Sequence, residues 1–463
     1  MHDLVLKGGT VADPLNRFFG IADVAVKDGK IAEVGRGLAG RETADCTGMI
    51  VQPGVIDTHL HASPDASSYK AIAYAGVTAC LDMMGPTEKV LAALPERGCG
   101  ISVAVCSAIL PGRNVEGNDP AKGEIERFIS DSLKGGAFGV KLLGGHFPLT
   151  PEATARFFAA ADDMHAYAAI HAGTTEKGSN IEGFEEAFEL FDGHPAHMAH
   201  INAYCRGYID SVSRECERAE RLLEAHPEVV CESYVSPRSG GEIGFGPDGL
   251  VKSHVVRTTL GRRGYSPDRK GVEQALRDRY LGLVRENADG LPELVDGEEG
   301  VEWLSGRDGI TCSFDQVNPI LPRVWFASAK RKDGTFLVDG LSTDGGAIPR
   351  NVILSLGLSV QKLGGFTPLE FAAKSSLLPA RMLGLASKGH LSAGADADVT
   401  VYDPVSQRAV KTLAQGRKVL WDGAVAAAPG RMICTKAGEA AVRAAGVEPV
   451  VVEGGIPALD RHF

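Results

Sequence analysis

The sequence predicts an α/β protein, in which a (β/α)₈ TIM barrel carries a small β-sandwich domain built from both ends of the chain. Three observations lead to this prediction. The chain has 463 residues, which is enough for one large domain and a smaller one. Between residues 53 and 384, short apolar runs alternate with segments of helical period. Both flanking regions, 1–52 and 385–430, instead alternate apolar and polar residues between Gly and Asp turns.

The two flanking regions resemble each other in their strand-and-turn pattern. Near the N-terminus the chain reads "HDLVLKGGTVAD", and much later it reads "GADADVTVYDP" up to Pro404. The stretch "KDGK" at Lys27–Lys30 predicts a hairpin, because Asp-Gly tolerates the left-handed backbone of a two-residue turn. The simplest interpretation is one β domain assembled from both chain ends.

Eight apolar runs of the central region are strand candidates, with helix candidates between them. These runs are Gly54–Thr58, Val77–Met83, Ile101–Ala108, Phe138–Leu143, Ala168–His171, Ala196–His200, Val229–Tyr234 and Leu337–Thr343. A clear helix start is Thr150 as N-cap, followed by Pro151 at the first helical position. Eight strand–helix units favour a closed barrel, and a flat doubly wound sheet is the alternative.

Residues 235–336 interrupt this rhythm and are predicted to be an insertion after a barrel strand. They hold glycine-rich loops, a basic segment "RTTLGRRGYSPDRK" and one helix over "VEQALRDRYLGLVRENA". Such an insertion lies at the C-terminal face of a barrel, where active sites form. It is interpreted as a lid or substrate-binding subdomain, or else as a peripheral or oligomer-forming one. The pattern assigns residues 431–463 no element of the barrel, and they are expected to form a C-terminal tail.

Composition excludes several classes of protein. The net charge of −11 argues against a nucleic-acid binder, which usually shows a basic patch or stripe. No run approaches the roughly 20 apolar residues of a membrane span, and the N-terminus lacks the features of a signal peptide. Nine cysteines without a CxxC pair indicate reduced thiols in a cytoplasmic protein. We expect a small-molecule substrate, no nucleic-acid or membrane partner, and a homo-oligomer.

The stretch "GVIDTHLHAS" at Gly54–Ser63 contains the first candidate site residues. Because side chains alternate along a strand, His59 and His61 point the same way with Leu60 opposed. Two imidazoles on one face are either a hydrogen-bonded core pair or half of a metal site. The pair alone leaves both readings open.

Other predicted strands also end in polar residues: histidines and an aspartate, which are of a type that can bind metals, and one lysine. Lys141 lies at the end of the fourth strand, His171 at the end of the fifth, His200 at the end of the sixth and Asp344 at the end of the eighth. Each has an ordinary explanation taken singly, such as a snorkelling lysine, a core histidine or a turn aspartate. Together they fall at one rim of one barrel, which indicates a metal centre with an open position for water.

With these residues the sequence resembles the amidohydrolase superfamily, in particular its dihydroorotase, hydantoinase and D-aminoacylase group. The motifs that carry the resemblance are "VQPGVIDTHLH", "GVK" on the fourth strand, single histidines on the fifth and sixth, "STDG" on the eighth and the returning "GADADVTVYDP". They span the whole chain except the insertion and the tail. The resemblance implies a binuclear site with two divalent ions, expected to be Zn²⁺.

The resemblance also implies a role for each residue of the site. His59 and His61 bind one metal, His171 and His200 bind the second, and Asp344 completes the first site. Lys141 bridges both metals as a carboxylysine, a carbamate formed from CO₂. On the sixth strand, His200 is preferred over His197, which is expected to be structural. The implied enzyme is an amidohydrolase that cleaves a C–N bond of an N-acyl amino acid, cyclic amide or similar small molecule. A hydroxide that bridges the metals attacks, and Asp344 is the catalytic base and acid.

Substrate contacts are expected from residues just past the barrel strands: His146, Tyr204, Tyr234 and Arg238. Isoaspartyl dipeptidases of the same superfamily place an arginine shortly after the sixth-strand histidine, where "HINA" has Ala203 and Arg206 comes later. The D-aminoacylases use a bridging cysteine, whereas here Cys80 lies within the second strand and "GVK" offers the lysine.

Two alternatives come from other classes: a mononuclear deaminase of a nucleobase-like ring, and a non-catalytic dihydropyrimidinase-like scaffold. The lysine argues against the first, and the complete ligand set argues against the second.

Overall fold

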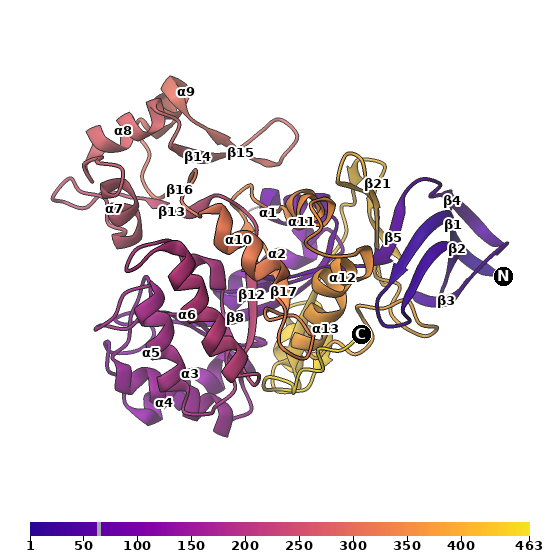
Figure 1. Ribbon diagram of the computed structural model, residues 1–463, viewed down its shortest axis with the longest axis horizontal. Coiled ribbons are helices and arrows are strands. Elements are labelled where there is room, and N and C mark those ends of the chain that lie inside the picture. Colours follow the sequence, from indigo (N-terminus) through magenta and orange to yellow (C-terminus); the bar gives the residue numbers. More distant parts are fainter. Residues whose placement is uncertain (63–65) are drawn as a thin grey trace.

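Parallel strands form the wall of a barrel in the computed structural model, which describes residues 1–62 and 66–463 (Figure 1). Along the wall the strands follow the order β17-β12-β11-β10-β9-β8-β7-β6-β18. In chain order they are β6 (Val55–His61), β7 (Val77–Asp82), β8 (Ser102–Ile109), β9 (Gly139–Leu143), β10 (Tyr167–His171), β11 (His197–Met198), β12 (Val230–Tyr234), β17 (Gly340–Ser342) and β18 (Gly345–Gly346).

The eighth barrel strand is split, and its two pieces close the barrel. Residues of β17 pair with β12, with Leu341 opposite Ser233, while β18 pairs with β6 on the other side, with Gly345 opposite Leu60. A single segment is therefore hydrogen-bonded to both the seventh and the first strand, which only a closed sheet permits. The barrel prediction is confirmed, and the flat doubly wound alternative is wrong.

Helices cover the outside of this barrel, as the alternating pattern predicts. They are α1 (Ala66–Tyr74), α2 (Thr87–Arg97), α3 (Lys122–Lys134), α4 (Pro151–Asp163), α5 (Ile181–Phe191), α6 (Val212–Ala225), α10 (Ile320–Ser328), α11 (Ile353–Lys362), α12 (Pro368–Ala372) and α13 (Leu378–Met382). At α4 the Thr150 hydroxyl accepts the Ala153 N–H and Pro151 occupies the first turn, as expected. Within the part of the chain that the structure describes, no helix combines the length and apolarity of a membrane span.

The inside of the barrel is packed and not hollow. Small and medium side chains such as Ala79, Ala104, Cys106 and Ala169 are buried there beside Tyr167. This apolar floor lies below the C-terminal ends of the strands. Polar side chains that cluster at those ends are therefore on a rigid base, open on one side only.

Both chain ends meet in one nine-stranded sheet at the side of the barrel. Its strands are β1 (His2–Asp13), β2 (Phe18–Lys27), β3 (Lys30–Gly35), β4 (Gly40–Asp45), β5 (Ile50–Pro53), β19 (Val399–Asp403), β20 (Arg408–Ala414), β21 (Arg417–Trp421) and β22 (Ala424–Val425). The N-terminal part joins the C-terminal part where β5 pairs antiparallel with β19. The predicted hairpin at Lys27–Lys30 is present, with Asp28 and Gly29 at positive φ.

The insertion folds as a small subdomain with its own sheet and core, and it projects beyond α10 in Figure 1. Its elements are β13 (Ser239–Ile243), α7 (His254–Gly261), α8 (Arg269–Arg277), β14 (Leu281–Glu286), β15 (Pro292–Val295), α9 (Gly297–Leu304) and β16 (Ile310–Phe314). The strands pair antiparallel in the order β13-β16-β14-β15.

One helix predicted inside the insertion is half wrong. The expected helix over residues 272–288 ends at Arg277 as α8, and the second half is strand β14. Arg279 has a positive φ of 57°, which ends the helical path. The side chains of Leu281 and Leu283 are buried on either side of Gly282; Leu281 pairs with Phe314 of β16, and the residues from Leu283 onward pair with β15. Glycine within "YLGLV" weakens a helix, so cross-strand pairing prevails over the helical period.

Residues 431–463 are expected to form a tail without barrel elements, but the structure shows two strands and a helix there. Strand β23 (Arg431–Thr435) pairs parallel with the first half of β8, and β24 (Glu448–Val452) pairs with β23. Helix α14 (Glu439–Ala444) connects them.

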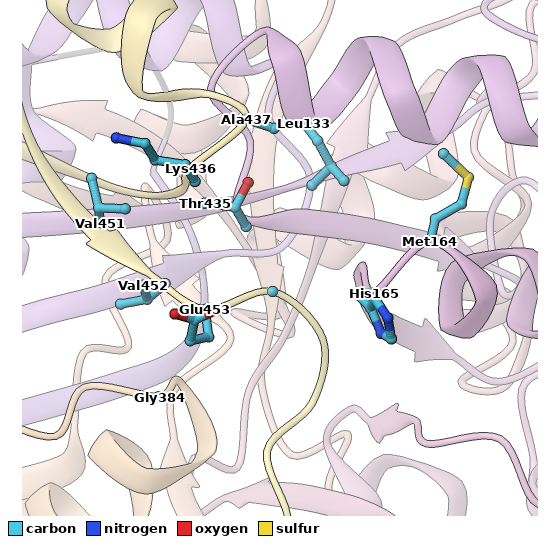
Figure 2. A pocket seen from close by; sticks show the side chains of 11 residues that line it. Leu133, Met164, His165, Gly384, Thr435, Lys436, Ala437, Val451, Val452 and Glu453 are labelled. Atoms are coloured by element: carbon cyan, nitrogen blue, oxygen red, sulfur yellow. The ribbon is translucent and has the colours of Figure 1, made fainter.

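A cavity of about 530 Å³ lies between this extension and the α4–β10 turn, lined by His165, Thr435 and Glu453 among others (Figure 2). It opens at the N-terminal side of β10, away from the strand ends that carry the candidate ligands.

Candidate functional site

The six predicted ligands lie together at the C-terminal rim of the barrel. His59 and His61 end β6, Lys141 is the third residue of β9, and His171 is the last residue of β10. Asp344 lies between β17 and β18, and His200 follows β11. They come from five different strand ends of the barrel wall, since His59 and His61 share β6, and the barrel closure gathers them. The residues divide into two groups joined by Lys141.

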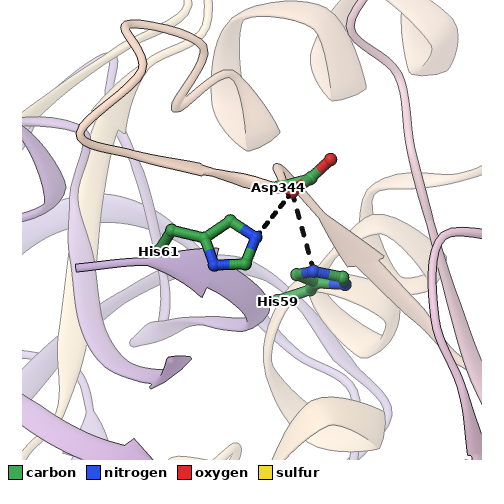
Figure 3. A group of neighbouring side chains, drawn as sticks. All are labelled: His59, His61 and Asp344. Atoms are coloured by element: carbon green, nitrogen blue, oxygen red, sulfur yellow. Dashed lines mark ion pairs between the residues drawn. The ribbon is translucent and has the colours of Figure 1, made fainter. Parts of the chain in front are cut away.

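The first group consists of His59, His61 and Asp344 (Figure 3). The Asp344 Oδ1 atom lies 3.1 Å from His61 Nε2 and 3.6 Å from His59 Nε2. All three ligand atoms lie within 4.8 Å of one another. Both rings thus turn their Nε2 atoms toward one carboxylate oxygen, which is the arrangement that a single cation between them requires.

The second group consists of His171 and His200. His171 Nδ1 lies 3.0 Å from His200 Nε2, and the rings meet edge to face. Two nitrogens bound to one Zn²⁺ at about 2.0–2.1 Å with a tetrahedral angle lie roughly 3.3 Å apart. The separation of these two nitrogens therefore suits a shared cation. The opposite nitrogen of His171, Nε2, is 2.7 Å from the Ser179 hydroxyl, which holds the ring.

Lys141 lies between the two groups and is fully buried. Its Nζ atom is 3.3 Å from His59 Nε2, and no carboxylate of the described residues forms an ion pair with it. Burial lowers the pKa of Lys141 to about 8, against the opposing effect of the Glu232 and Asp344 carboxylates. A buried amine with a depressed pKa has a substantial neutral fraction, the form that is nucleophilic.

Glu232 is a site residue that the sequence analysis missed. It lies on β12, fully buried, and its Oε1 atom is 2.6 Å from His59 Nδ1 and 2.7 Å from the backbone N–H of His200. Its other oxygen accepts a hydrogen bond from the Ser342 hydroxyl. A carboxylate on Nδ1 places the proton there and leaves Nε2 of His59 as the free lone pair. One side chain thus orients a residue of each group.

His200 and Asp344 have left-handed backbone conformations, which are uncommon for residues other than glycine. The φ angle is 37° at His200 and 49° at Asp344. Such conformations cost energy and concentrate at functional sites. The expected strand over Ala196–His200 is shorter, because β11 ends at Met198 and the backbone turns at His200. The turn explains why His200 faces His171, whereas His197 remains inside the barrel with Nδ1 2.9 Å from the Tyr167 hydroxyl.

Three of the histidines are held in their neutral form. Burial, followed by the neighbouring cationic groups, lowers the pKa of His59, His171 and His200 well below the usual value. Neutral imidazole is the form that binds metals. The electrostatic environment and the geometry of these rings therefore agree.

Asp344 remains ionised although it is largely buried. Burial acts to raise its pKa, but the Arg350 guanidinium and the His61 and His59 side chains lower the pKa of Asp344 well below the usual value. Arg350 Nη2 lies 2.7 Å from Asp344 Oδ2. Arg350 is a second residue that the sequence analysis missed. It lies in the loop after β18 and has no strand-end pattern that marks it.

The four expected substrate contacts have different surroundings. His146 is exposed at the rim, with its ring edge-on to His171 at 5.4 Å. Arg238 is half-buried, and its guanidinium forms a long ion pair of 3.7 Å with Asp315. Tyr204 and Tyr234 are each 1% exposed. The Tyr204 hydroxyl accepts the Ala172 N–H, so this tyrosine braces the strand end after His171 and does not face the open rim.

Arg206 is half-buried at the same rim and is a further residue of interest. Its Nε atom donates to Asn318 Oδ1 at 2.9 Å and its Nη2 atom to the Tyr234 hydroxyl at 3.2 Å. Among the described residues no carboxylate forms an ion pair with it. Its charge contributes to the lowered pKa of His200, which places it beside the second group. A fixed guanidinium without a counter-ion is a ready contact for an anionic ligand.

The donor set fits divalent cations. Histidine nitrogens and a carboxylate converge in two groups, and Zn²⁺ accepts this mixture of ligands. The Nδ1 atoms of His61 and His200 are buried without a hydrogen-bond partner, so neither ring is held by the protein through its second nitrogen. The orientation of each ring would be fixed once its Nε2 atom binds a cation.

Comparisons with known proteins agree with this fold. A model of the amidohydrolase family matches residues 320–423, which include Asp344. A dihydroorotase of Pelotomaculum thermopropionicum is 28% identical over 445 residues, covering 87% of this chain and 89% of that protein. A D-aminoacylase mutant in complex with CuCl₂ aligns with a TM-score of 0.67 and 17% identity, covering 94% of this chain and 100% of that one. An N-acyl-D-glutamate deacylase from Bordetella bronchiseptica, complexed with zinc and a phosphonate inhibitor, aligns with a TM-score of 0.64 and 17% identity, over 93% and 99% of the chains. The two solved structures show that the fold is shared.

Proposed function

We propose that the chain is a member of the amidohydrolase superfamily and that it hydrolyses a C–N bond of an N-acyl amino acid or a cyclic amide at a binuclear metal centre. It is a hydrolase that acts on C–N bonds other than peptide bonds. The observation that carries the proposal is the convergence of six potential ligands at one barrel rim, in two groups with ligand-like separations.

In this proposal His59, His61 and Asp344 hold one divalent ion and His171 and His200 hold the other. Bound divalent ions supply Lewis-acid polarisation of a carbonyl and lower the pKa of a water molecule. Glu232 accepts the proton of His59 Nδ1 in a hydrogen bond, which leaves the Nε2 lone pair of His59 free for a metal ion. We expect Zn²⁺, since nitrogen and carboxylate ligands suit it, and the deacylase that aligns with this chain was crystallised with zinc.

Lys141 is proposed to carry a carbamate and to bridge the two ions. Its buried Nζ atom lies beside His59 Nε2, and no carboxylate in residues 1–62 or 66–463 forms an ion pair with it. An ammonium there would repel both cations, whereas a carbamate is an anion with two oxygens to share between them. The depressed pKa of Lys141 supports reaction with CO₂, because the neutral amine is the reacting form.

Asp344 is proposed to move the proton. Its Oδ1 atom faces the histidines, while Oδ2 is bonded to Arg350. Oδ1 therefore takes the proton from the attacking water and delivers it to the departing nitrogen, which needs protonation to leave. The exposed ring of His146 is proposed to contact the substrate on the side of His171.

The substrate is proposed to carry a carboxylate. Arg206 offers a fixed guanidinium that pairs with no carboxylate in the part of the chain that the structure describes, and Arg238 lies half-buried in the segment that leads into β13. An N-acyl amino acid presents a carboxylate next to its amide. The dihydroorotase that is 28% identical indicates a cyclic amide as the second candidate, and the aligned deacylases indicate a linear one.

A metal titration joined to a substrate screen tests the proposal. Protein prepared without chelators should contain about two divalent ions per chain. It should release amine or acid from N-acyl amino acids, hydantoins or cyclic imides. Asp344→Asn should keep most of the metal while kcat falls by about 10²–10⁴. His171→Ala should instead lose activity by losing metal. Well-folded protein without any metal would refute the proposal.

Two broader expectations accompany the proposed function. The nine cysteines are all free and buried, which suits a location in the cytoplasm. A homo-oligomer remains a prediction, to be measured by sedimentation.

A further inference from the structure

Arg350 connects the proposed catalytic carboxylate to the insertion. Its side chain is 2% exposed, and its two terminal nitrogens have different partners. Nη2 lies 2.7 Å from Asp344 Oδ2, and Nη1 donates to the backbone carbonyl of Arg238 at 2.9 Å. Arg238 directly precedes β13, the first strand of the insertion. One planar guanidinium therefore spans from the barrel rim to the inserted subdomain.

The contact gives the two oxygens of Asp344 separate tasks. Oδ1 faces His61 Nε2 and His59 Nε2, and Oδ2 is held by the Arg350 cation. Asp344 has a left-handed backbone, so its side chain is not directed by a regular strand. A charge-assisted hydrogen bond from a buried arginine restricts the rotation of a carboxylate more than a neutral donor does. The orientation of Oδ1 therefore depends on Arg350.

The other end of the contact is equally well defined. The Arg238 carbonyl also accepts a hydrogen bond from Asn318 Nδ2 at 2.8 Å. Gly240 of β13 lies so close that a Cβ atom there would be 3.3 Å from Arg350 Nη2 and 2.1 Å from Ile348 Cδ1. The strand is therefore packed directly against the Arg350 loop. Any movement of β13 changes the position of the Arg350 fork.

We propose that Arg350 is a positioning residue that couples the seating of segment 236–243 to the orientation of Asp344. The inference rests on the proposed function for the role of Asp344, and the coupling itself is a property of the contacts above. Because coupling is reciprocal, fixing Asp344 with a metal ion stabilises segment 236–243, and loosening that segment frees Asp344. The insertion then controls the catalytic carboxylate and does more than cover the rim.

Hydrogen exchange of segment 236–243 tests the coupling without any substrate. Zn²⁺ added to metal-free wild-type protein should slow exchange in this segment by about tenfold or more. Arg350→Met should exchange faster there and should no longer respond to Zn²⁺. Asp344→Ala should loosen the same segment even without metal, since Arg350 then loses its anchor. If Asp344→Ala leaves exchange in 236–243 unchanged, the coupling does not exist.

Arg323→Met is the matched control. Arg323 Nη1 donates to the Val235 carbonyl at 2.9 Å, so it also holds the entry to the insertion, but it does not touch Asp344. This variant should loosen the entry while exchange in 236–243 still responds to Zn²⁺. An equal loss of response in both variants would mean that general loosening, and not Arg350, is responsible.

Kinetics separate the inference from the proposed function. Arg350→Met should lower kcat by about 10²-fold with KM within a factor of two, because a misplaced proton carrier impairs the chemical step. Arg350→Lys keeps the charge but cannot contact both partners with one planar fork, so it should recover kcat only in part. Full kcat in a folded Arg350→Met protein overturns the inference. No turnover and no Zn²⁺ binding by the wild type overturns the proposed function, while the Asp344→Ala exchange result still decides the coupling.

Discussion

Glu232 Oε1 lies 2.6 Å from His59 Nδ1, and both side chains are buried below the rim of the barrel. The same oxygen accepts the backbone N–H of His200. One carboxylate on the seventh strand therefore orients a candidate ligand on the first strand and the turn that carries another. Residues that hold ligands in this way influence metal affinity although they do not touch the metal.

Glu232→Gln should weaken metal binding by about 10–100-fold while the protein stays folded. The amide keeps the size of the side chain but is a weaker acceptor for the His59 Nδ1 proton than a carboxylate. Competition with a coloured chelator measures the affinity. Glu215→Gln is the control, because Glu215 is also fully buried and accepts the backbone N–H groups of Gly207 and Ile209, whereas no candidate ligand among the described residues forms a hydrogen bond with it. An unchanged affinity in Glu232→Gln would remove this residue from the site.

Lys141→Ala should lose the metals and nearly all activity. The substitution removes the amine that lies 3.3 Å from His59 Nε2 and that is proposed to carry the carbamate. Short-chain carboxylic acids should restore part of both, because their oxygens replace the bridging carbamate. Elemental analysis and turnover are measured together, and intact mass of the wild type under gentle conditions should show the added CO₂. Undiminished metal binding by Lys141→Ala would argue that Lys141 is a structural lysine.

Arg206→Met should distinguish the substrate classes. Loss of its guanidinium should raise KM for N-acyl amino acids by about 10–100-fold, which corresponds to the roughly 1.5–3 kcal/mol of a charged hydrogen bond. Neutral cyclic amides should be affected much less. The ratio of kcat/KM values for the two classes checks this. Equal losses for both classes would indicate that Arg206 supports the rim through Asn318 and Tyr234 and does not bind a substrate anion.

Arg461→Met should destabilise the barrel, because it breaks an ion pair at the N-terminal end of strand β17. Arg461 Nε lies 2.5 Å from Asp339 Oδ1, and Asp339 is completely buried just before β17. Breaking a buried pair leaves an uncompensated charge and costs about 3–5 kcal/mol, to be read from urea unfolding. Arg443→Met, which removes an exposed ion pair with Glu439 in the same C-terminal region, should change the unfolding midpoint little. Similar midpoints for both variants would show that the C-terminal extension adds no stability.

Much of the site was predictable because its signals are local. Each candidate ligand is a polar residue at the end of an apolar run, as in "GVIDTHLH" and "GVK". Because side chains alternate between the two faces of a strand, the sequence position decides which side chains point the same way. Because the barrel strands are parallel, their C-terminal ends lie at one rim. Glu232 has no such signal, because it lies in the middle of the strand "VCESY" and not at its end. Its role becomes clear only when its partner is known.

The sequence by itself therefore determined the barrel, the returning β domain and the positions of the six candidate ligands. Only the tertiary structure decided that Glu232 meets His59, that Arg350 joins Asp344 to Arg238, and that β23 completes the sheet beside β8. It also decided that "YLGLVRE" is a strand of the insertion and not a helix. Periodicity is a property of neighbouring residues along the chain. Partnerships across the barrel depend on how closure staggers the strands, and no short stretch of sequence contains that information.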